Sequence, residues 1–77
     1  MTGPSRVRFT AHARLRLDRR RLGLDQVETL VLEAHERRTR NQGQADWRLA
    51  QGEIIVLYDW PAAEDQTLAL VRSAWRR

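Results

Sequence analysis

The stretch EIIVLYD, from Glu53 to Asp59, decides the fold of this chain. It contains an unbroken apolar run, and most of its residues are of the β-branched or aromatic types that favour strands. A strand without polar alternation is typical of a position that is covered on both faces. The stretch therefore predicts a central strand, around which the rest of the fold is arranged.

Weaker strand patterns lie on both sides of this stretch. DWRLA and the possible strand RRTR precede it, separated by the turn-like NQGQ, and the tight turn QG leads into it. After the turn WPAAED, QTLALV forms the last expected strand, followed by the basic, tryptophan-containing RSAWRR. Near the N-terminus RVRF alternates and predicts a short first strand.

Two helices are expected between the first strand and the later ones. Thr10 can cap a helix that ends near Arg21, and Gly23 breaks the chain before a second helix that opens at Asp25. Asp25 and Glu28 have the spacing of a capping box. The second helix has a core stripe at helical intervals, formed by Val27, Leu30, Val31 and Ala34.

These elements predict an α+β fold. In it, two N-terminal helices, after a short strand, pack on one face of a three- to four-stranded antiparallel meander sheet. The 77 residues suffice for one core, so we expect a flexible leader over 1–5, a single domain over 6–75 and a basic tail over 76–77.

The composition narrows the environment and the chemistry. There is no cysteine, which excludes disulfides and thiolate metal sites and fits a reducing compartment. No segment has the apolar length of a signal peptide or a membrane span, so we expect a cytoplasmic protein without membrane contact. His12 and His35 are far apart and lack an accompanying acid cluster, so neither a metal site nor a cofactor is expected.

Positive charge is concentrated in the first third of the chain. The net charge is +4, and all 14 basic residues are arginines. Residues 1–24 contain seven arginines against one aspartate, whereas acids slightly outnumber arginines in the remainder. A local basic surface of this kind favours a polyanion such as nucleic acid, or an acidic protein, as partner.

The first helix has its basic residues on an unusual side. At 100° per residue, His12, Arg16 and Arg20 form one stripe, with Arg19 beside it. The stripe lies between an apolar flank of Ala13 and Leu17 and another of Ala11 and Leu15, while Arg14, Asp18 and Arg21 form the expected solvent face.

Two interpretations of the stripe remain open. It lines a cleft, or it is a structural network in which Arg16 and Arg20 pair with acids such as Glu28 or Asp59.

We expect Tyr58 in the core and His35 near a helix end, where it favours the helix dipole. The tryptophans divide in the same way: we expect one or two in core or edge packing, and Trp75 is the best candidate to stack on a base.

The segment HARLRLDRRRLGLDQVE resembles the H-A-x-x-R-[LM]-x-x-R pattern of a prokaryotic family of small uncharacterised domains. These domains are related to the RelE and BrnT toxins, with the barnase–EndoU–colicin–RelE ribonuclease fold. The likeness covers roughly Arg6 to Trp75. The chain departs from the pattern at Arg21, where the family has glycine, and late in the last strand, where Arg72 or Ser73 replaces a threonine. Residues in register are His12, Ala13, Arg16, Leu17, Arg20, Leu22, Val27 and Glu28.

This resemblance implies a metal-independent, RNA-cleaving ribonuclease of a toxin–antitoxin system. Its substrate would be RNA or ribosome-bound mRNA, and a cognate antitoxin would be its partner. Imidazole can transfer protons near neutral pH, and guanidinium groups can hold phosphate. The implied catalytic residues are His12, Arg16 and Arg20, and the implied nucleic-acid contacts are Arg19, Arg48, Arg72 and Trp75. The alternative is a non-catalytic module on the same fold that binds nucleic acid or an acidic protein.

Overall fold

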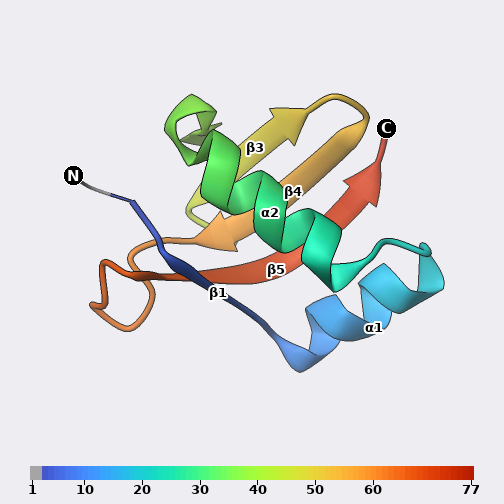
Figure 1. Cartoon of the computed structure of the whole chain (residues 1–77), viewed down its shortest axis with the longest axis horizontal. Helices are drawn as coiled ribbons and strands as arrows, with labels where there is room; N and C mark the ends of the chain where they lie inside the picture. Colours follow the sequence, from blue (N-terminus) through green and yellow to red (C-terminus); the bar gives the residue numbers. More distant parts are fainter. Residues whose placement is uncertain (1–2) are drawn as a thin grey trace.

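The computed structural model describes residues 3–77 and shows an α+β fold with a five-stranded mixed sheet (Figure 1). No helix within these residues is long and apolar enough to cross a bilayer. The elements, in chain order, are β1 (Arg6–Phe9), α1 (Ala11–Arg19), α2 (Leu24–Ala34), the 3-10 turn η1 (His35–Arg37), β2 (Thr39–Arg40), β3 (Trp47–Gln51), β4 (Ile54–Asp59) and β5 (Leu68–Arg76).

The sheet corrects one part of the sequence prediction. Its order is β1-β5-β4-β3-β2, and β2 to β5 form the expected antiparallel meander. The first strand joins the same sheet by pairing in parallel with β5, so the sheet has five strands and is mixed. A parallel partner some sixty residues away leaves no local sequence signal, because no tight turn connects the two strands.

The last strand is longer than its apolar pattern predicts. β5 continues from Leu68 through Arg76, so RSAWR belongs to the strand. Arg77 still follows the sheet, because its backbone N–H donates to the Glu53 carbonyl at 2.7 Å. Of the expected leader, Met1 and Thr2 lie outside the described residues, and Ser5 is fixed by a bond from its backbone N–H to the Thr67 carbonyl.

The core lies between α2 and one face of the sheet. Figure 1 shows α2 lying across the strands, and its buried residues Val27, Val31 and Ala34 confirm the predicted stripe. Alternate residues of β4 face this helix, and Tyr58, fully buried, is a core residue as expected. The other face of β4 carries Leu57, which is only half-buried.

Helix α1 begins as the sequence predicts. The Thr10 hydroxyl accepts from the Ala13 N–H at 2.9 Å, which caps the helix. Ala13 and Leu17 are buried in the common core, whereas Leu15 is 48 % exposed. Only one of the two expected apolar flanks therefore packs, because α1 lies at the side of the sheet, against β5 beyond the end of β1 (Figure 1).

The end of α1 is closed by a Schellman motif. The Leu22 N–H donates to the Leu17 carbonyl, and the Arg21 N–H donates to the Asp18 carbonyl. This geometry places Arg21 at a φ of 56°, in the left-handed region where glycine is favoured. The helix itself ends at Arg19, two residues before the predicted end.

Helix α2 begins one residue earlier than predicted. Its N-cap is Gly23, which offers no side chain to the helix, and Asp25 lies in the first turn. The predicted capping box is therefore absent, and Asp25 interacts favourably with the helix dipole instead.

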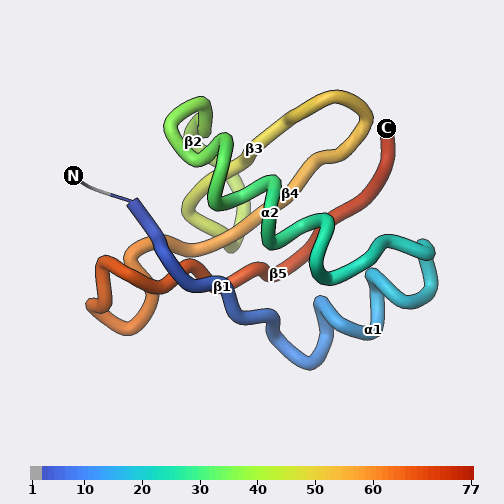
Figure 2. The backbone as a smooth tube through the Cα atoms, viewed as in Figure 1, coloured from blue at the N-terminus to red at the C-terminus, as the bar shows by residue number. Residues whose placement is uncertain are grey.

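The loop between β4 and β5 fastens β1 in place. Figure 2 shows this loop beside the start of β1, and Arg6 forms an ion pair of 2.6 Å with Asp65. Hydrogen bonds donated by the Thr67 hydroxyl and backbone, together with the Arg6 charge, hold the pKa of Asp65 below its usual range. The position of β1 in turn sets where α1 begins.

Candidate functional site

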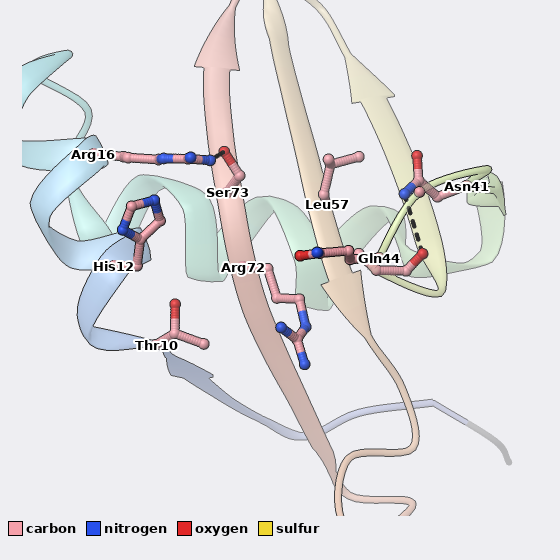
Figure 3. A pocket seen from close by; sticks show the side chains of 10 residues that line it. Thr10, His12, Arg16, Asn41, Gln44, Leu57, Arg72 and Ser73 are labelled. Atoms are coloured by element: carbon pink, nitrogen blue, oxygen red, sulfur yellow. Dashed lines mark hydrogen bonds between the residues drawn. The ribbon is translucent and has the colours of Figure 1, made fainter.

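A pocket of about 530 Å³ opens on the sheet face that α2 leaves uncovered. Figure 3 shows it with α2 passing behind the strands, α1 on one side and the β2–β3 loop on the other. Its floor comes from β4 and β5. The lining residues are Thr10, His12, Arg16, Asn41, Gly43, Gln44, Ala45, Leu57, Arg72 and Ser73.

Strand register and a bulge build the floor. Leu57 pairs with Ser73, but the next residue, Tyr58, pairs with Val71, so Arg72 is an extra residue in β5. The bulge lets two consecutive residues, Arg72 and Ser73, line the same pocket. A regular strand would place one of them on the core face.

His12 and Arg16 enter the pocket from α1. They are four residues apart, so they lie on one side of the helix. Arg16 is half-buried and its Nη1 donates to Ser73 Oγ at 3.2 Å, while His12 is exposed at the pocket wall. The structure thus brings together His12, Arg16 and Arg72 of the residues that the sequence singled out.

Arg20 contacts Ser73 but does not itself line the pocket. Its Nη1 donates to the Ala74 carbonyl at 2.8 Å and lies 3.5 Å from Ser73 Oγ. The pairing of β1 with β5 stops at Phe9 and Val71, so the Ala74 carbonyl lies on a free stretch of strand edge. Arg20 therefore provides a hydrogen-bond donor to a carbonyl at the free edge of β5 and helps to hold the Ser73 hydroxyl in position.

Ser73 is the residue that sequence reasoning missed. The sequence points to it only as one of two possible replacements for a family threonine, yet its hydroxyl is the acceptor for Arg16 and, at longer range, for Arg20. The side chain is 5 % exposed. Because guanidinium groups occupy the lone pairs of Oγ, its O–H is free to donate to an anion in the pocket.

The predicted acid partners of the stripe are wrong. Asp59 pairs with Arg72 through a 2.6 Å contact between Arg72 Nε and Asp59 Oδ2. Among the described residues no ion pair joins Arg16 or Arg20 to a carboxylate. Two arginines of the stripe are therefore held by neutral acceptors, which leaves their positive charge uncompensated beside the pocket.

Three predicted contact residues lie outside the pocket lining. Arg48 pairs with Leu57 one strand further along the uncovered face. Trp75 follows the core residue Ala74, so it lies on the uncovered face too, opposite Ile55. Both extend the floor of the pocket as a wider surface, whereas Arg19 is exposed on α1 and its side chain has no hydrogen bond to another described residue.

The far wall of the pocket is a folded loop, not an open turn. The Asn41 side chain donates to the Ala45 carbonyl at 3.1 Å, and the Asn41 N–H donates to the Asp46 carbonyl. Asp59, besides holding Arg72, accepts from the Asp46 N–H through Oδ1 at 3.0 Å. One carboxylate thus links the arginine of the floor to the loop of the wall.

His35 belongs to a separate, buried cluster. Its Nδ1 lies 2.9 Å from Tyr58 Oη, and its ring meets Trp60 edge-on at 4.5 Å between centroids. Burial, with the nearby Arg38 charge, lowers the pKa of His35 to about 4. The expected interaction of a charged His35 with the helix dipole is therefore absent at neutral pH.

The same cluster contains two of the three tryptophans. The Arg38 guanidinium lies 4.1 Å from the Trp47 ring centroid and 5.0 Å from that of Trp60. Each indole N–H donates to a backbone carbonyl. Trp47 and Trp60 thus serve packing, which leaves Trp75 on the uncovered face.

Comparison of the chain with protein-family models, with curated proteins and with solved structures gave no match. Among residues 3–77, no three His, Cys, Asp or Glu side chains are grouped closely enough to hold a metal ion. The described pocket lining contains hydrogen-bond donors of hydroxyl and nitrogen groups, which suit an anion, and no carboxylate that would suit a cation.

Proposed function

We propose that this chain is a metal-independent ribonuclease of a toxin–antitoxin system, acting in the cytoplasm on RNA or ribosome-bound mRNA. The observation that carries the proposal is the convergence of His12, Arg16, Ser73 and Arg72 on one open pocket. These side chains supply a proton acceptor and several donors for a phosphate, which are the groups that RNA transesterification needs.

In the proposed reaction the 2′-hydroxyl of RNA attacks the adjacent phosphorus. The imidazole of His12 takes the hydroxyl proton as the new P–O bond forms. Arg16 and the Ser73 hydroxyl stabilise the charge that develops on the phosphoryl oxygens. The bond to the 5′-oxygen then breaks, leaving a 2′,3′-cyclic phosphate. That oxygen takes a proton from water, because no second imidazole and no carboxyl is among the described residues that line the pocket.

The other basic residues have supporting roles in this proposal. Arg20 holds Ser73 in position and contacts the substrate only through it. Arg48 and Trp75 extend the uncovered face, where they would contact a neighbouring phosphate and stack on a base. An antitoxin that blocks this face would present acidic side chains to it.

The test is an RNA cleavage assay in EDTA, with and without ribosomes. We expect the wild type to leave 2′,3′-cyclic phosphate ends, and His12→Ala and Arg16→Ala to lower the rate about 100-fold or more. Arg14→Ala is the matched control, because Arg14 is exposed on α1 and does not line the pocket. Absence of cleavage under both conditions would contradict the proposal.

A second candidate is a non-catalytic RNA-binding module on the same surface. It is favoured by the fact that His12 is the one imidazole or carboxyl among the described pocket residues, whereas efficient transesterification uses both a base and an acid. This candidate predicts salt-sensitive RNA binding that is weakened by Arg16→Ala, with no cleavage.

A further inference from the structure

The pocket has two chemically different halves. On the α1 side lie an imidazole, two guanidinium groups and a buried hydroxyl. On the side of the β2–β3 loop, the lining is uncharged and consists of Asn41, Gly43, Gln44, Ala45 and Leu57. A phosphate alone would fill only the first half, whereas the whole pocket, about 530 Å³, is within the size range of sites that bind small organic ligands.

Gln44 and Asn41 are the polar side chains of the uncharged half, and Asn41 is engaged by its bond to the Ala45 carbonyl. Figure 3 shows the Gln44 side chain reaching from the loop across the sheet toward β5. Its carboxamide has no hydrogen bond to another described residue, so both its donor and its acceptor are free. Leu57, which lines the same pocket, is half-buried and offers an apolar surface to a flat ring.

The loop that carries Gln44 is held in a defined shape. The Asn41 side chain bonds to the Ala45 carbonyl, and Asp59 bonds to the Asp46 N–H. Gly43 packs closely there, since a Cβ at this position would lie 3.2 Å from Asn41 Nδ2. The Gln44 backbone is thus fixed relative to Arg72, which the same Asp59 holds.

We propose that Gln44 reads a nucleobase and that the pocket binds one nucleotide, with its phosphate at α1 and its base at the β2–β3 loop. This inference rests on the proposed function for the placement of the phosphate. One wall of the pocket packs against β5 and the other leads into β3. Two strand spacings, about 10 Å, separate these two strands. That span corresponds to the reach of one nucleotide from its phosphate to the edge of its base.

The favoured base is adenine. A carboxamide donates from its nitrogen and accepts at its oxygen, and adenine offers the complementary pair at N7 and the N6 amino group. Guanine presents two acceptors, N7 and O6, on the same edge, which leaves the Gln44 oxygen without a donor. The proposal therefore places the N7 edge of the base against Gln44, an arrangement that favours adenine over guanine by hydrogen bonding, while Leu57 contributes contact without selectivity.

The test is an NMR titration with inorganic phosphate and with each of the four 3′-nucleoside monophosphates. For the wild type we expect 3′-AMP to bind about tenfold or more tightly than 3′-GMP. Gln44→Ala should lose this preference and keep the wild-type affinity for inorganic phosphate. Gln42→Ala is the matched control, since Gln42 is an exposed glutamine of the same loop that does not line the pocket.

Each outcome separates this inference from the proposed function. Equal affinity for all four nucleotides, or an adenine preference that survives in Gln44→Ala, overturns base reading while phosphate binding keeps the anion site. An adenine preference without any RNA cleavage upholds the nucleotide site and overturns the ribonuclease. Failure of phosphate and of every nucleotide to bind overturns the nucleotide site altogether, and RNA cleavage in the same preparation then decides the proposed function by itself.

Discussion

Among the described residues His35 has a strongly lowered pKa, of about 4, and it does not line the candidate pocket. Its Nε2 is buried and has no hydrogen-bond partner among the described residues, so a proton there would be poorly solvated. Tyr58 and Trp60 lie against its ring, and burial raises the pKa of Tyr58 to about 12. Both side chains of the His35–Tyr58 pair are therefore neutral at neutral pH.

We expect stability to fall as the pH drops from about 6.5 to about 4. In this window the unfolded chain protonates His35 while the folded protein does not, because burial lowers the pKa in the fold to about 4. The free energy of unfolding should decrease by up to about 3 kcal/mol across the window. Urea unfolding at a series of pH values measures it.

Two variants isolate this effect. His35→Gln should show a clearly shallower dependence on pH than the wild type, whatever its absolute stability. His12→Gln should keep the wild-type slope, because His12 is exposed at the pocket wall. If His12→Gln loses the pH dependence while His35→Gln keeps it, the assignment of this dependence to His35 is wrong.

At the scale of the element, the end of α1 has a strained backbone conformation that a single substitution can relieve. Arg21 adopts a left-handed φ of 56° at the position where glycine is favoured. We expect Arg21→Gly to raise the free energy of unfolding by about 0.5–1 kcal/mol, since the relief exceeds the entropy that glycine adds to the unfolded chain. Thermal unfolding should show a melting temperature about 3–6 °C higher.

Arg19→Gly is the matched control for this variant. It removes an arginine of the same helix, but from a residue with helical conformation, so it should destabilise the protein by about 1 kcal/mol. Similar losses in both variants would show that the arginine charge, rather than the backbone conformation, decides the result.

Elements with local signals could be predicted from the sequence. Thr10 caps α1 through its own neighbours, the α2 stripe of Val27, Val31 and Ala34 repeats at helical spacing, and the apolar run of β4 marks the central strand. Each of these features depends on residues within one or two turns or within one strand. The fold class followed from them.

The features that complete the candidate site depend on distant residues. The parallel pairing of β1 with β5 has no connecting turn, and the bulge that places Arg72 beside Ser73 shows only in the register with β4. The shape of the Gln44 loop depends on Asp59, thirteen residues from the Asp46 N–H that it holds. The sequence therefore identified the helix side of the pocket and missed its floor hydroxyl and its far wall.

At the scale of the whole molecule, the distribution of charge predicts how RNA binding responds to salt. The uncovered face gathers Arg16, Arg72 and Arg48 around the pocket. If these three contact phosphates of single-stranded RNA, log K should fall against log salt with a slope of about −2. Arg48→Ala should make that slope shallower by about 0.7 and weaken binding to all sequences alike.

Fluorescence titrations with a labelled oligonucleotide at several salt concentrations measure this slope. Arg37→Ala is a suitable control, because Arg37 follows α2 and lines a different cavity beside that helix. An Arg48→Ala slope equal to that of the wild type would remove Arg48 from the RNA contact surface.

The parallel pairing of β1 with β5 also determines when the domain can complete its fold during synthesis. β1, α1 and α2 leave the ribosome first, yet the strand that holds β1 and packs against α1 comes last, at Leu68–Arg76. A nascent chain that stops short of Ser73 has His12 and Arg16 but lacks the hydroxyl to which Arg16 donates. Because Arg72 and Ser73 line the pocket, it can form only after nearly all of the domain has been translated. An incomplete copy of this protein therefore lacks the pocket on which the proposed ribonuclease activity depends.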